Sequence, residues 1–159
     1  MQFLVWLQSR PIAVWVGESQ SLFAYPGVLL LHTIGLAMVV GPSVVLNLRL
    51  LGVGRRIPLA TLKNVFPLMW VGFAINASSG IVLFAAAAEL TGVKPVFYVK
   101  LGLILLAMIT VTRIRRSVFG NPLMPDPDAP IPAIVKILAG TLLILWGAAI
   151  TAGRYTAYL

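Results

Sequence analysis

The stretch SLFAYPGVLLLHTIGLAMVVGPSVVLNL, residues 21–48, decides the fold because it carries no charged side chain. It belongs to a run of 30 uncharged residues between Glu18 and Arg49. A second run of 25 uncharged residues separates Lys63 from Glu89. A helix that crosses a bilayer needs roughly 20 apolar residues. Both runs are therefore long enough to span a membrane.

The composition of the whole chain points the same way. Of its 159 residues, 60% are hydrophobic and 10% are charged, and the mean hydropathy is +0.99. Soluble domains carry about 25% charged residues. We therefore predict an integral membrane protein, and we exclude a soluble globule, a disordered tail and a collagen-like repeat.

Four spans account for most of the chain. They are expected near 21–48, 64–88, 95–114 and 132–153. A proline-rich loop over 121–130 separates the last two spans. The predicted fold is all-α, an integral membrane four-helix bundle that forms a single membrane domain over 1–159.

The segment 1–19 precedes the first span. Trp6 and Trp15 suit the membrane–water interface, Pro11 interrupts the segment and Glu18 closes it. We predict one or two short amphipathic helices that lie in the interface. The alternative is a flexible apolar arm that docks on the bundle.

Lysine and arginine side chains collect on one side of this topology. Eight of them flank the loops after the first and third spans, namely Arg49, Arg55, Arg56, Lys63, Arg113, Arg115, Arg116 and Lys136. Three lie on the other side, namely Arg10, Lys94 and Arg154. The positive-inside rule then predicts a multi-pass protein of the bacterial inner membrane with both termini outside.

The net charge of +8 sits at the ends of apolar runs. There it attracts anionic lipid headgroups, so we expect the lipid bilayer as a partner and no nucleic acid. The arginines at these ends are interpreted as determinants of topology. The sharper alternative is a clamp for an anionic lipid or a propionate.

Two ionisable residues lie inside the spans, where such groups need a partner. His32, the only histidine, lies near the middle of the first span or just on its outer side. It can act as a metal or haem ligand, as a proton carrier, or as a buried hydrogen-bonding residue. Lys100 lies in the third span, and we expect it to meet His32 in the outer half of the bundle. It can pair with a haem propionate or extend to the headgroups as an anchor.

Three further residues are candidates for cofactor binding. Gly35 lies one turn from His32 and either lets a flat ring approach or packs a neighbouring helix. Asn76 belongs to a small and polar stripe expected to face protein, as glue or as a pocket wall, together with Gly72, Ser79, Gly80 and Leu83. Met38 is a soft ligand, but it lies six residues from His32 and points elsewhere, so core filler is the alternative.

Other patterns limit the chemistry. The fourth span carries a similar stripe of Gly140, Gly147, Thr151 and Arg154, which we predict to pack, with Arg154 at the outer headgroups. The chain has no cysteine, and its four carboxylates fall outside the span interiors, which excludes thiolate metal sites and leaves a carboxylate relay unsupported. With one histidine, the sixth ligand of a haem would be Met38, the His32 of a second protomer, or nothing.

Three sequence segments carry a resemblance to a known group. They are LHTIGL at 31–36, NASSGIVLF at 76–84 and FYVKLG at 97–102. Over about residues 20–115 the chain resembles small four-helix bacterial membrane proteins that group with the HemJ-type protoporphyrinogen oxidase and the CopD-like copper-resistance domain. The resemblance implies binding of b-type haem, with His32 and Lys100 at the positions of the oxidase family's functional histidine and lysine.

Three functions follow as expectations. The first is a haem b protein that transfers electrons or serves a redox partner. The second is a non-catalytic membrane subunit or scaffold, in a larger complex or a homo-oligomer. The third is a subunit for uptake of copper or another metal. We expect a hydrogen bond from His32 to the backbone in a scaffold, and a cavity beside the Lys100 amine in a cofactor protein.

Overall fold

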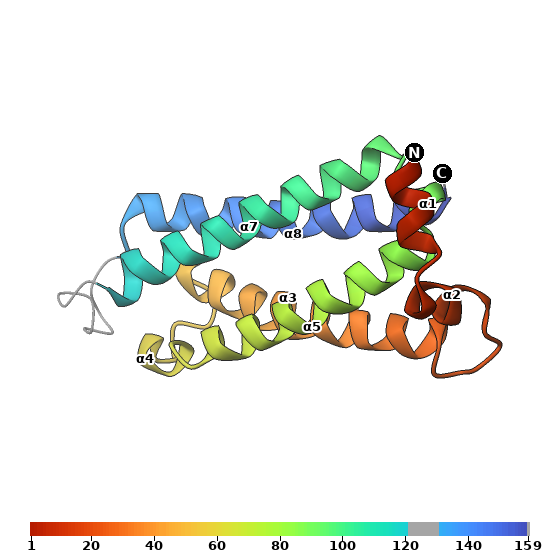
Figure 1. Cartoon of the computed structure of the whole chain (residues 1–159). Helices are drawn as coiled ribbons and strands as arrows, with labels where there is room; N and C mark the ends of the chain where they lie inside the picture. The colour runs from red at the N-terminus through yellow and green to blue at the C-terminus, as the bar shows by residue number, and fades with distance from the viewer. Residues whose placement is uncertain (121–130, 159) are drawn as a thin grey trace.

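Four long helices form the body of the protein (Figure 1). The computed structural model describes residues 1–120 and 131–158, in which no strand occurs. The long helices are α3 (Tyr25–Leu51), α5 (Val65–Ala86), α7 (Pro95–Phe119) and α8 (Ala133–Tyr158). Each is long and apolar enough to cross a bilayer. The predicted all-α four-helix bundle is confirmed, and the chain is a multi-pass integral membrane protein.

The spans begin and end a few residues away from their predicted limits. Helix α3 continues to Leu51 and stops at Gly52, whose φ of +103° lies in the left-handed region that a glycine adopts without strain. Helix α7 continues to Phe119, because its last turns are rich in arginine, which favours helix. The predicted proline-rich loop over 121–130 lies outside the described residues.

Four short helices close the two ends of the bundle. They are α1 (Gln2–Gln8), α2 (Pro11–Glu18), α4 (Leu59–Leu62) and α6 (Ala88–Thr91). Helix α1 packs on α6, and α2 packs on α5. Ala13 and Val16 are buried in this contact, and the amide of Glu89 donates to Gln8 Oε1 at 3.0 Å. The N-terminal segment is thus helical, as predicted, and it also docks on the bundle; its place at the membrane interface stays a prediction.

The long helices pack as two antiparallel hairpins, α3 with α5 and α7 with α8 (Figure 1). Helix α3 also contacts α8, whereas the α5 and α7 backbones do not approach closely. The first and last described residues lie at one end of the bundle, which we call the terminal end. The other end carries the loop 52–58 and the last turn of α7, and we call it the basic end.

The apolar core lies in the half of the bundle near the basic end. Its largest buried members come from all four long helices and include Leu46, Phe66, Met69, Ile114, Leu142 and Trp146. In the half near the terminal end, α7 has no buried residue before Ala107. The two hairpins therefore share their buried core in one half, whereas in the other half the Phe84 ring of α5 stacks on the Phe97 ring of α7, with centroids 4.8 Å apart.

The predicted packing of Gly140, Gly147 and Thr151 of α8 is wrong. Nothing lies within 4 Å of a Cβ added at Gly140 or Gly147, and Thr151 is exposed. Arg154 is also exposed, and its place at the outer headgroups stays a prediction. Helix α8 instead buries the face that carries Val135, Ala139, Leu142, Trp146 and Ala149. That face has the larger apolar side chains, so its burial removes more surface from the surroundings and fills the core.

Candidate functional site

The crossing of α3 and α5 sets the geometry of the polar site. A Cβ added at Gly35 would lie 2.6 Å from the amide nitrogen of Asn76 and 2.9 Å from the carbonyl oxygen of Gly72. A Cβ added at Gly72 would lie 2.5 Å from Cβ of Met38. These two backbones touch only because both positions are glycine. Gly35 therefore packs a helix in this structure, and the space beside it is filled by α5.

One turn nearer the terminal end, His32 and Asn76 bond to each other's main chain. The Nδ1 atom of His32 lies 2.9 Å from the main-chain oxygen of Asn76. The side-chain Nδ2 of Asn76 donates to the main-chain oxygen of His32 at 2.8 Å. Each side chain thereby hydrogen-bonds to a main-chain oxygen of the other helix. Together the two bonds fix the position of α3 relative to α5.

The carbonyl oxygen of Asn76 decides where the imidazole carries its proton. A carbonyl only accepts hydrogen bonds, so Nδ1 of His32 must be the donor. The hydroxyl of Ser79 donates to Ile75 at 2.6 Å and offers Nδ1 a second acceptor at 3.2 Å. Nε2 then holds a free lone pair, and no residue in the described part of the chain hydrogen-bonds to it. This is the form in which histidine ligates a metal.

Gly80 makes room for the ring. A Cβ added at Gly80 would lie 3.1 Å from Cε1 and 3.4 Å from Nδ1 of His32. The imidazole ring is half-buried and lies against α5. A residue larger than glycine at position 80 would therefore displace the ring. The predicted protein-facing stripe of α5 is confirmed at Gly72, Asn76 and Ser79, all of which are buried.

Lys100 comes from α7, in the half of the bundle near the terminal end. Its Cδ, Cε and Nζ atoms all lie 3.5–3.7 Å from where a Cβ at Gly153 would be, so its stem rests on α8. Neighbouring Lys94 donates to the main-chain oxygen of Thr156 at 3.0 Å. The Lys100 ammonium, in contrast, has no hydrogen-bond or ion-pair partner among residues 1–120 and 131–158.

The structure does not bring Met38 to the imidazole. Met38 packs on Gly72 and His32 packs on Gly80. These glycines are eight residues apart on α5, which is about 12 Å along a helix. Of the five predicted residues, His32 and Asn76 therefore share one site, and Lys100 lies on α7 in the same half of the bundle. Gly35 and Met38 lie at the helix crossing, apart from the imidazole.

A second polar cluster was not predicted. Trp146 Nε1 donates to Ser43 Oγ at 3.0 Å, and Asn47 Nδ2 approaches the same oxygen at 3.3 Å. All three side chains are buried between α3 and α8. The four-residue spacing of Ser43 and Asn47 was the only sequence signal, and it could not identify the partner on α8. This cluster connects the two hairpins inside the core.

Two cavities lie at the basic end, away from His32. Their volumes are about 370 and 400 Å³. The described residues contain no group of three or more His, Cys, Asp or Glu that could hold a metal ion.

Comparison with known proteins adds no assignment. A scan against protein-family models, a search of curated proteins and a search of solved structures each gave no match. The fold and the site therefore define the class, a multi-pass membrane four-helix bundle with a polar site where α3 and α5 cross.

Proposed function

We propose that the chain binds one haem b between its two hairpins, near the terminal end, with Nε2 of His32 as axial ligand. One observation carries the proposal: Nδ1 is fixed on a carbonyl, so Nε2 keeps a lone pair that no described residue uses. Histidines that ligate metals usually donate their other ring N–H in this manner, which fixes the tautomer and the orientation of the ring.

The residues at the site fit the chemistry of a haem. The porphyrin supplies four nitrogen ligands, so a single protein imidazole is sufficient. Lys100 offers an ammonium group without a described partner, and a haem propionate is an anion that would pair with it. In the half near the terminal end, a planar group can enter between the hairpins if the stacked rings of Phe84 and Phe97 move apart, and this leaves the core in the other half undisturbed.

Each residue then has its own task. Asn76 and Ser79 hold Nδ1, which leaves Nε2 for the iron. Lys100 compensates a negative charge that would otherwise be isolated in the bilayer. The iron supplies a one-electron redox couple when the haem is bound. The resemblance to the HemJ-type oxidases supports this role, and it extends the proposal to a redox partner or to porphyrinogen oxidation.

The same proposal includes a location. The chain lies in the bacterial inner membrane, with the terminal end outside and the basic end in the cytoplasm, because that places eight cations inside.

The experiment is an absorption spectrum of the protein purified in detergent after expression with added haem precursor. We expect a Soret band in the wild type and in Thr33→Val, whose hydroxyl bonds only within α3. We expect no Soret band in His32→Ala. A wild type without a Soret band, or a His32→Ala variant that keeps one, would contradict the proposal.

A second candidate is a non-catalytic membrane subunit, and the reciprocal bonds of His32 and Asn76 favour it. A hydrogen bond from histidine to backbone was expected of a scaffold. It is equally expected of a metal ligand, so Nδ1 alone does not separate the two functions. Nε2 does separate the two functions, because a scaffold protein would leave the lone pair of Nε2 without a role. Metal uptake, the third expectation, stays a prediction.

A further inference from the structure

Three cations converge on one cavity at the basic end. The cavity has a volume of about 400 Å³ and is lined by Lys63, Thr112, Arg115, Arg116, Phe119 and Gly120. Lys63 lies between α4 and α5, whereas both arginines belong to the last turns of α7. A volume of this size suits a small organic group. The cavity thus has two walls, and each wall contributes positive charge.

One aromatic ring, that of Phe119, lines the cavity. Phe119 meets Phe66 of α5 edge-to-face, with ring centroids 5.4 Å apart. The guanidinium of Arg115 lies 5.7 Å from the centroid of the Phe66 ring. The guanidinium N–H groups have no hydrogen-bond partner within the described residues, and a guanidinium binds anions well.

The described carboxylates are remote from these cations. Glu18 ends α2 and Glu89 lies in α6, both at the terminal end. Within the described residues the cavity is therefore strongly positive. It lies at the end of the spans, where the phosphates of a bilayer are found.

An apolar path leads from the cavity into the membrane. Residues Leu105, Ile109, Thr112 and Arg116 follow one face of α7 by helical spacing. Leu105 and Ile109 are exposed in the isolated chain, at 62% and 42%. This exposed face of α7 is free to contact lipid. A cationic cavity at the end of an apolar helix face has the polarity of an anionic phospholipid.

We propose that this cavity binds the phosphodiester headgroup of an anionic phospholipid such as phosphatidylglycerol, with an acyl chain along the exposed apolar face of α7. The site is independent of the haem proposed near the terminal end. A specific lipid site differs from the general attraction of cations to the membrane surface. The general attraction would be weakened equally by the loss of any arginine pair at this end, whereas a specific site depends on the arginines that line the cavity.

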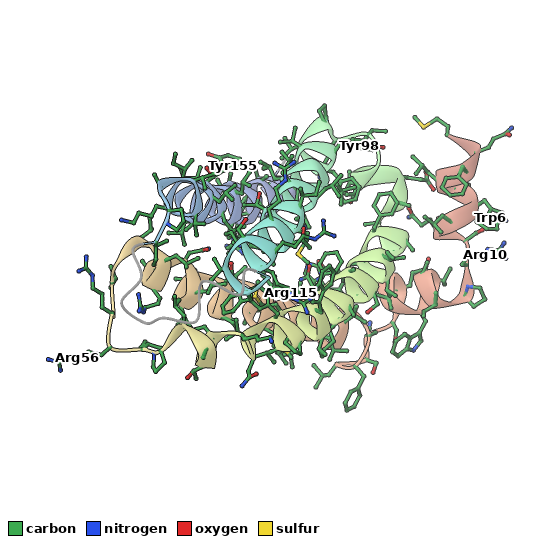
Figure 2. All side chains as sticks on the ribbon, turned by 90° about the vertical axis from the view of Figure 1, so that its left-hand side faces the viewer. Trp6, Arg10, Arg56, Tyr98, Arg115 and Tyr155 are labelled. Atoms are coloured by element: carbon green, nitrogen blue, oxygen red, sulfur yellow. The ribbon has the colours of Figure 1, made fainter. Side chains whose placement is uncertain are left out.

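The chain offers a matched control for that distinction. Arg55 and Arg56 are exposed in the loop 52–58 at the same end, and neither lines the cavity. In Figure 2, Arg56 extends away from the bundle, whereas Arg115 lies over the helices. The pairs Arg115→Gln/Arg116→Gln and Arg55→Gln/Arg56→Gln remove the same charge from the same end.

The test measures thermal stability of delipidated protein in a neutral detergent, titrated with phosphatidylglycerol or with phosphatidylcholine. For the wild type and Arg55→Gln/Arg56→Gln we expect saturable stabilisation by phosphatidylglycerol only. For Arg115→Gln/Arg116→Gln we expect affinity weaker by roughly tenfold or more, as loss of a charge-assisted hydrogen bond implies. Equal responses of the two pairs, or of the two lipids, would overturn the proposal.

Two further arms separate the remaining explanations. Thr112→Trp keeps every cation and fills the cavity, so it should also lose the stabilisation by phosphatidylglycerol. This variant serves as the test if Arg115→Gln/Arg116→Gln does not fold. Inorganic phosphate at millimolar concentration should not displace the lipid, because it lacks the acyl chain. Displacement by phosphate, or a full response in Thr112→Trp, would show that no lipid site exists here.

Discussion

His32 and Asn76 each donate a side-chain hydrogen bond to the main-chain oxygen of the other, at 2.9 Å and 2.8 Å. The two bonds differ in what they do. The bond from Asn76 joins α3 to α5, whereas the bond from His32 also fixes the tautomer of the imidazole. Because the acceptor for His32 is a main-chain atom, it survives any substitution of the Asn76 side chain.

This difference predicts the behaviour of Asn76→Ala. The variant removes the hydrogen bond from the Asn76 side chain to the main-chain oxygen of His32. The unfolding free energy of the protein should therefore fall by about 1 kcal/mol. The ring keeps its own acceptor, so haem binding should persist. Unfolding in mixed detergent gives the first quantity and the Soret band the second. A variant of normal stability that has lost the Soret band would show that Asn76 acts on the cofactor directly.

The glycine crossing predicts a second effect on stability. Gly35→Ala places a methyl group against the backbone of α5, which cannot yield, so the unfolding free energy should fall by about 1–3 kcal/mol. Gly102→Ala is the control, since nothing lies within 4 Å of its added Cβ. That variant should be unchanged or slightly more stable, because alanine favours helix. Equal effects of the two substitutions would contradict the close crossing.

The absence of native cysteine makes the orientation testable with single cysteines. Gln20→Cys lies at the terminal end and Val53→Cys at the basic end, and both positions are exposed. A membrane-impermeant maleimide should label Gln20→Cys in intact bacterial cells. It should label Val53→Cys only after the membrane is permeabilised. The reverse pattern would place the basic end outside and refute the assignment from charge.

Much of the fold could be predicted because the uncharged runs are long and the bilayer demands helices. The position of the four spans follows from Glu18, Lys63 and the other charges that separate them. The buried face of α8 could not be predicted. All faces of that helix are apolar, so the stripe through Gly140 and Gly147 looked like a packing surface, and only the tertiary structure shows that the face through Trp146 is buried.

The site could be predicted in part for the same reason. An ionisable group in a span is rare enough to stand out, which singled out His32 and Lys100. The role of the carbonyl of Asn76 could not be foreseen, because every residue has one and its partner depends on how two helices cross. Gly153 and Gly80, which make room for Lys100 and His32, are likewise informative only once their neighbours are known.

The most direct test of the central claim is chemical rescue at Nε2. His32→Gly removes the imidazole and leaves a space beside Gly80, so purified His32→Gly should show no Soret band when haem is added. Free imidazole should restore the band by ligating the iron from that space. We predict binding in the wild type, loss in His32→Gly and recovery with imidazole. Haem binding by His32→Gly that is as tight as in the wild type, without imidazole, would show that this histidine is not the ligand.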